Sequence, residues 1–136
     1  MAGYSGTPLP RKLGIKENQQ IALVNKPGSF QKQLGALPTN THLVSKLTAP
    51  LDLVVLFVES ERALAKQFPA IAKKISMNGM IWVAWPKKSS GVPSDLSFDL
   101  VQRIGLECGL VDVKICAVDE VWSGLKFVIR LKDRKK

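Results

Sequence analysis

The stretch that decides the fold runs from Leu51 to Trp85 and reads LDLVVLFVESERALAKQFPAIAKKISMNGMIWVAW. It opens and closes with the apolar runs LDLVVLFV and MIWVAW, which are typical of strands covered on both faces of a parallel sheet. The segment between them carries apolar residues at steps of four, three and four, which places them on one face of a helix: Leu64, Phe68, Ile71 and Ile75. The stretch therefore predicts a strand, a helix and a second strand.

The ends of this helix are marked by residues that commonly cap helices. Ser60 is expected to cap the start, and Asn78 with Gly79 to end it. Pro69 lies inside the pattern and lacks a backbone N–H, so we expect it to kink the helix or divide it in two.

The flanking sequence extends the alternation of strands and helices. On the N-terminal side, QQIALVN (19–25) and the weaker THLVSKL (41–47) are candidate strands around a short helix in SFQKQLGAL (29–37). On the C-terminal side, SDLSFDLVQRIGLECG (94–109) predicts a helix capped by Ser94 or Asp95 and ended by Gly109. VDVKICAVDE (111–120) and LKFVIRLK (125–132) predict an antiparallel hairpin joined by VWSG (121–124).

These elements predict a three-layer α/β fold, with a mostly parallel sheet that ends in one antiparallel hairpin strand. We expect residues 1–14 to form an extended N-terminal arm, residues 15–132 a single α/β domain, and residues 133–136 a basic tail. Cys108 and Cys116 lie among apolar residues and are expected to be core thiols rather than a disulfide.

Composition restricts the function classes. The 136 residues are 46% hydrophobic and 23% charged, as in ordinary globular domains. No apolar run approaches the ~20 residues of a membrane span, and the N-terminus has no secretory signal, so we expect a cytoplasmic protein without a membrane partner. The net charge of +9 permits nucleic acid as a partner but does not favour it, because the basic residues are dispersed. The oligomeric state is open.

Two resemblances follow from these segments. LDLVVLFV, GMIWVAWP and VDVKICAVDEVWSGLKFVIR resemble the last four strands of class I methyltransferases, which implies a Rossmann-like fold, here truncated. From GYSGTPL and KLGIK to WVAWPKKSSG and WSGLKFV, nearly the whole chain also resembles a small bacterial family of unknown function, which implies no activity.

The sequence departs from the methyltransferase pattern where that family binds S-adenosylmethionine. The family has an acidic residue and a Gly-x-Gly loop after the first strand, whereas this chain has Asn25 and a single glycine, Gly28. Lys46 stands where a carboxylate would hold the ribose. No segment between the second strand and LDLVVLFV is long enough for a further helix and strand.

Ligands of open parallel sheets bind beyond the carboxyl ends of the strands, and this rule selects the candidate site residues. The rule and the loop chemistry select Asn25, Lys26, Gly28, Ser29, Glu59, Trp85, Lys87, Lys88, Ser89, Ser90, Asp119, Glu120 and Trp122. The loop PKKSSG has cations and hydroxyls for an anion, and a helix starting near Ser94 would point its N–H groups toward that loop. A solvated turn is the alternative for this loop. Core packing is the alternative for Trp85, and for Trp122 a cap on the core; Asp119 and Glu120 are adjacent and would diverge along a strand.

Our leading hypothesis is a non-catalytic domain that binds a small anion, of nucleotide or phosphate type, at this edge. Lys26, Lys87, Lys88, Ser89 and Ser90 would hold the anion, and Trp85 and Trp122 would form apolar walls. A minimal S-adenosylmethionine-dependent methyltransferase is the second hypothesis, and a basic protein that binds RNA or DNA the third. No motif predicts a catalytic residue, a metal site or a bound cofactor.

Overall fold

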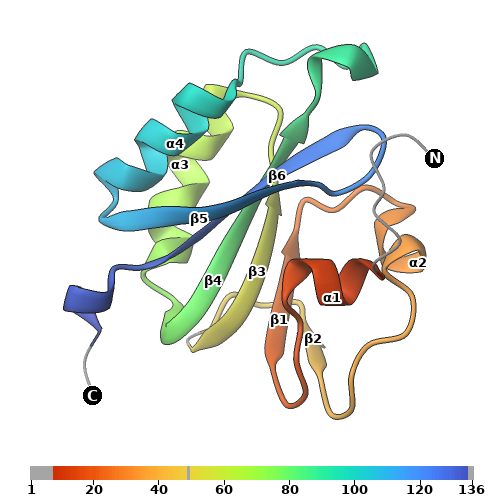
Figure 1. Ribbon diagram of the computed structural model, residues 1–136, viewed down its shortest axis with the longest axis vertical. Coiled ribbons are helices and arrows are strands. Elements are labelled where there is room, and N and C mark those ends of the chain that lie inside the picture. The colour runs from red at the N-terminus through yellow and green to blue at the C-terminus, as the bar shows by residue number, and fades with distance from the viewer. Residues whose placement is uncertain (1–7, 49, 135–136) are drawn as a thin grey trace.

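A six-stranded sheet lies between two layers of helices in the computed structural model, which describes residues 8–48 and 50–134 (Figure 1). The strand order is β2-β1-β3-β4-β6-β5, in which β1 to β4 are parallel and β6 runs antiparallel to both neighbours. The strands are β1 Gln20–Val24, β2 His42–Val44, β3 Leu51–Phe57, β4 Ile75–Pro86, β5 Leu110–Ala117 and β6 Trp122–Ile129. The predicted fold class is confirmed.

The helices divide between the two faces of the sheet (Figure 1). The first pair is α1 (Leu9–Leu13) and α2 (Phe30–Leu34), and the second is α3 (Glu61–Ala72) and α4 (Phe98–Glu107). Short 3₁₀ helices cover Lys88–Ser90 and Leu131–Asp133. No helix in the described ranges has the length and apolar character needed to cross a membrane.

Each face of the sheet has its own hydrophobic core. Trp82 is fully buried on the face of α1 and α2, where its indole N–H donates to the Leu13 carbonyl oxygen at 2.8 Å. Trp85 belongs to the opposite core, with α3 and α4. The odd spacing of the two tryptophans along β4 predicts these opposite faces, and that prediction is confirmed. The thiols of Cys108 and Cys116 are free and half-buried.

The helix predicted after β3 begins as expected and ends early. The Ser60 hydroxyl accepts a hydrogen bond from the Ala63 N–H and caps α3. The helix continues past Pro69 as one element but stops at Ala72, so the predicted end at Asn78 and Gly79 is wrong. Ile75 is the first residue of β4 rather than part of the helical stripe, because it pairs with Leu51 of β3.

Three other boundaries differ from the sequence-based predictions. Residues 9–13 of the predicted extended arm form α1, whose Leu13 is fully buried, while residues 1–7 lie outside the described residues. The cap of α4 is Ser97, which accepts from the Leu100 N–H, so the prediction of Ser94 or Asp95 is wrong. The hairpin turn precedes Trp122, which is the first residue of β6.

Candidate functional site

The order of the strands selects one place at the carboxyl edge of the sheet. From β1 the chain crosses to β2 on one side, and from β3 it crosses to β4 on the other. The order therefore reverses between β1 and β3, which is where open α/β sheets bind ligands. A cavity of about 330 Å³ opens there, lined by Asn25, Pro27, Phe57, Val58, Glu59, Ser60, Ala63 and Trp122. Its volume is at the lower end of the range for small-molecule sites.

The wall of this cavity combines aromatic rings with one carboxylate. Trp122 meets Phe57 edge to face at 5.1 Å between ring centroids, and Phe30 also packs edge to face with Phe57, at 4.8 Å. Glu59 is exposed at the mouth, directly after β3. Of the described residues that line the cavity, none is Lys or Arg. The local charge therefore favours a cation over an anion.

The residues after β1 fix the backbone rather than cradle a ligand. Asn25 adopts a left-handed backbone conformation with φ of 59°, and its amide donates to the Phe57 carbonyl oxygen at 3.1 Å and to Gln67 Oε1 at 2.9 Å. It ties the end of β1 to the end of β3 and to α3. Gly28 is exposed, and a Cβ added there would meet nothing within 4 Å. No close backbone approach therefore requires this glycine. Ser29 precedes α2 and accepts from the Gln33 side chain.

The hairpin between β5 and β6 is shaped by a nearly buried carboxylate. Asp119 is 8% exposed, and its Oδ1 accepts from the N–H groups of Val121 and Trp122, both at 2.8 Å. This Asx turn sets the direction in which Trp122 leaves the hairpin. Glu120 is exposed and lies outside the cavity wall. Asp119 therefore positions Trp122, and it does not form a facing pair with Glu120.

Several polar groups of the loop after β4 bond within the loop or to the hairpin between β5 and β6. The Lys87 N–H donates to the Val121 carbonyl oxygen at 2.7 Å. The Ser90 hydroxyl donates to the Lys87 carbonyl oxygen at 2.6 Å and accepts from the Val92 N–H. Lys88 and Ser89 are exposed, and no residue of PKKSSG lines the cavity. Because α4 starts at Phe98, its N-terminus is seven residues beyond Gly91 and gives this loop no helix end.

Three of the thirteen predicted site residues meet in the cavity: Asn25, Glu59 and Trp122. Trp85 is 5% exposed and packs in the core under α3 and α4, so it is not a pocket wall. Lys26 lines a separate cavity of about 390 Å³ beside β2. The carboxyl-edge rule also selects Pro27 and Ser60, whereas sequence reasoning missed Phe57, Val58 and Ala63 as lining residues. Phe57 closes an apolar run that reads as core throughout, and the sequence carries no signal that its ring reaches the edge.

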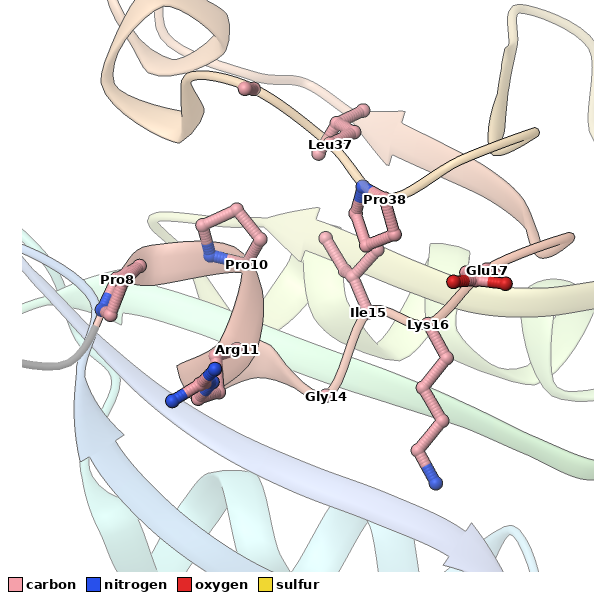
Figure 2. Close-up of a pocket in the computed structure, with 10 residues that line it drawn as sticks. Pro8, Pro10, Arg11, Gly14, Ile15, Lys16, Glu17, Leu37 and Pro38 are labelled. Carbon is pink, nitrogen blue, oxygen red and sulfur yellow. The ribbon is translucent and has the colours of Figure 1, made fainter.

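A larger cavity of about 670 Å³ lies away from the carboxyl edge, between α1 and the segment that follows α2 (Figure 2). Prolines and aliphatic residues form much of its wall, with Pro8, Pro10 and Ile15 opposite Leu37 and Pro38. None of the predicted site residues lines it. Strand topology, which predicts where α/β sheets bind ligands, favours the smaller cavity.

Comparison with known proteins gives the fold but no sequence family. No protein-family model matches the sequence, and no curated protein sequence matches it. The resemblance to a small bacterial family therefore stays a prediction.

Among solved structures, the chain is similar to magnesium protoporphyrin IX methyltransferase from Synechocystis with bound S-adenosylhomocysteine. The TM-score is 0.62 at 10% identity, over 90% of this chain and 78% of that one. It is also similar to Aeropyrum pernix fibrillarin with bound S-adenosyl-L-methionine, with a TM-score of 0.58 at 12% identity over 90% and 69% of the two chains. A third similar structure is a S-adenosylmethionine-dependent methyltransferase from Aquifex aeolicus, with a TM-score of 0.56 at 12% identity over 88% and 87%. The methyltransferase-like fold predicted from the last strands is confirmed.

These findings correct our leading hypothesis of a non-catalytic domain for a small anion. The structures similar to this chain include methyltransferases, and two of the three described above hold S-adenosyl-L-methionine or S-adenosylhomocysteine. The cavity also lacks the expected lysines, since Lys87 and Lys88 do not line it. Spacing along the chain predicts the sheet edge at which the cavity opens, but it could not show which side chains of that edge turn toward the cavity.

Proposed function

We propose that the chain is a minimal S-adenosylmethionine-dependent methyltransferase whose cofactor binds in the cavity between the ends of β1 and β3. The observation that carries the proposal is the lining of that cavity, which joins aromatic rings to a carboxylate and has no Lys or Arg among its described residues. S-adenosylmethionine has a flat purine and a sulfonium cation, and such a wall suits both. A cytoplasmic location stays a prediction from the sequence.

Each lining group has a defined part in this proposal. Trp122 and Phe57 provide apolar ring surface for the purine, and Glu59 provides negative charge for the sulfonium. Asn25 and Asp119 position these groups, through the end of β1 and the turn before Trp122. When bound, S-adenosylmethionine supplies an electrophilic methyl group on sulfur. The chain contributes binding and orientation, and we assign it no general base.

The departures from the methyltransferase pattern are consistent with this smaller site. Gly28 makes no close approach and Asn25 is occupied by backbone contacts, so we expect the aromatic wall to provide most of the affinity. A ring that stacks on a base contributes about 1–3 kcal/mol. The absence of a glycine loop predicts weak binding, with a dissociation constant in the micromolar to millimolar range.

The test is calorimetric titration with S-adenosylmethionine and with S-adenosylhomocysteine, which lacks the sulfonium charge. We expect both molecules to bind. Trp122→Ala should lower the affinity for both by about fivefold to a hundredfold, from the stacking energy above. Glu59→Gln should weaken the binding of S-adenosylmethionine alone, by about 1.4-fold to fivefold, because an exposed charge pair contributes ~0.2–1 kcal/mol.

Glu120→Gln is the matched control, since it removes an exposed carboxylate that does not line the cavity. It should leave both affinities unchanged. No binding of either molecule at about 1 mM would overturn the proposal. Binding that is indifferent to both Trp122→Ala and Glu59→Gln would place the cofactor elsewhere.

A further inference from the structure

Three lysines that are far apart in the sequence lie together on the open part of the sheet face that carries α1. Lys114 of β5 and Lys126 of β6 are directly opposite each other across the antiparallel pair. Lys16 follows α1 and is close enough to Lys126 to act on its charge. We name these three residues the basic strip.

A β-bulge creates the lysine pair. The register of β5 with β6 shifts between Asp112 and Lys114. Asp112 pairs with Phe127 and reaches Gln102 of α4, so it faces the α3 and α4 layer. If the register of the Asp112–Phe127 pair continued unchanged, Lys114 would oppose Leu125 and face that same layer, because a shift of one residue moves side chains to the other face. The bulge instead turns Lys114 to the side of Lys126.

This arrangement is unfavourable for the folded protein by itself. Like charges directly opposite each other on a sheet are destabilising. Burial, together with the charges of Lys114 and Lys16, lowers the pKa of Lys126. In the described part of the chain, the single salt bridge joins Arg103 to Glu61, so no carboxylate neutralises the strip.

One lysine of the strip, Lys126, lies against a buried aromatic ring. The ammonium group of Lys126 lies 5.8 Å from the centre of the Trp82 ring. The same indole donates to the carbonyl oxygen of Leu13 and so anchors the end of α1, just before Lys16. Figure 2 shows the side chains of Arg11 and Lys16 extending away from Leu37 and Pro38.

The chemistry of the strip points to a polyanion in solution. A membrane surface would be met by cations combined with a cluster of exposed apolar side chains. Here the exposed large apolar side chains are dispersed over β2, β4, α4, β5 and the segment after β6. The backbone of a single-stranded nucleic acid is flexible, so its phosphates can contact lysines on β5, on β6 and in the segment after α1. Each such contact releases counterions.

We propose that the basic strip formed by Lys16, Lys114 and Lys126 binds the phosphate backbone of single-stranded nucleic acid. Every second residue of β6 faces the same side of the sheet, so Trp122 and Gly124 lie on the same face as Lys126. This face therefore leads from the basic strip to Trp122 at the carboxyl edge. A nucleic-acid strand bound along this face would pass the cavity between the ends of β1 and β3. The proposal does not depend on methyl transfer, because phosphate binding by the strip needs no cofactor.

The test is fluorescence anisotropy with labelled single-stranded RNA and DNA of the same sequence, without cofactor, across a range of salt concentrations. Three phosphate contacts predict that log K falls against log salt with a slope near −2, from about −0.7 per contact. Lys114→Gln/Lys126→Gln should weaken binding at least about tenfold at low salt and make the slope less steep by about 1.4. Lys16→Gln alone should weaken binding in the same direction without touching the sheet.

Lys66→Gln/Lys73→Gln is the matched control, because it removes the same charge from two exposed positions across the sheet, one on α3 and one at its C-cap. It should change affinity less than about twofold at moderate salt, where distant charges are screened. Thermal unfolding of each variant checks that it is folded. The proposal is overturned by no binding in 50 mM salt, by equal losses in both double variants, or by strip-dependent binding to vesicles containing phosphatidylserine without binding to either oligonucleotide.

Discussion

The carboxylate of Asp119 is the sharpest single test of how the fold positions the candidate site. It is 8% exposed and accepts from two N–H groups, both at 2.8 Å. A hydrogen bond to a charged group contributes about 1.5–3 kcal/mol, and water can replace part of that in a turn that is only partly buried. We therefore expect Asp119→Ala to lower the free energy of unfolding by about 2 kcal/mol, and to lower the melting temperature by about 7 °C.

Two variants separate this explanation from a general effect of charge. Asp119→Asn keeps an oxygen in place without the charge, so it should lose only about half as much stability. Glu120→Ala removes the neighbouring exposed carboxylate and should change stability by less than about 0.5 kcal/mol. Urea unfolding measures all three. The explanation is refuted if Asp119→Ala unfolds within about 0.5 kcal/mol of the wild type, or loses no more stability than Glu120→Ala. The hydrogen bonds of the turn would then not account for the burial of this carboxylate.

The same variant links the turn to the cavity. Asp119 does not line the cavity, whereas Trp122, which its carboxylate holds, does. Asp119→Ala should therefore lower the affinity for S-adenosylmethionine as well as the stability of the fold, and the affinity is measured at a temperature where the variant is still folded. Unchanged affinity would show that Trp122 keeps its place without the turn.

Three further predictions concern the opposite face, the cap of α4 and the strip. Gly105→Ala adds a Cβ that would clash with the Phe127 ring. The cost of overpacking, about 1–3 kcal/mol, should exceed the ~1 kcal/mol gain in helix propensity, so urea unfolding should show a less stable protein. A variant as stable as the wild type would contradict this prediction. Ser97→Ala removes the cap and should lose about 1 kcal/mol, measured by thermal unfolding, and Ser94→Ala should lose less than half of that; equal losses would reject Ser97 as the cap. The folded protein releases the Lys126 proton at lower pH than the unfolded chain, because burial and neighbouring lysines lower that pKa, so stability should rise with pH in the alkaline range below 10.5. Lys126→Gln should remove this rise in stability with pH. If the variant keeps the pH dependence of the wild type, Lys126 is not its cause.

The sequence predicts the fold well where one pattern dominates. The apolar runs around Leu53 and Val83 are too continuous for anything but strands buried on both faces, and both are fully buried. The end of α3 could not be found, because Ile75 satisfies the helical spacing and also suits a strand. Its pairing with Leu51 decided the outcome, and such a contact is not visible in local sequence.

The candidate site is less predictable for a related reason. Strand order gives the edge, and Asn25, Glu59 and Trp122 were found by it. The direction of each side chain depends on turns and bulges that the sequence does not reveal. Lys87 and Lys88 looked like ligand contacts because they follow a strand, yet their loop turns aside and bonds to the hairpin. The bulge in β5 that pairs Lys114 with Lys126 has no marker in the residues around it.

Asp95 gives the loop after β4 an influence on a cavity that it does not line. Its carboxylate accepts from the Glu61 N–H at 2.8 Å, and Ser60 occupies the Ala63 N–H, so the positive end of α3 already has its own anion. An incoming carboxylate or phosphate would have to compete with a group tethered at high effective concentration. A cation meets no such competitor. A carboxylate of the chain itself thus occupies an N–H group at the start of α3 that a free phosphate would otherwise bind.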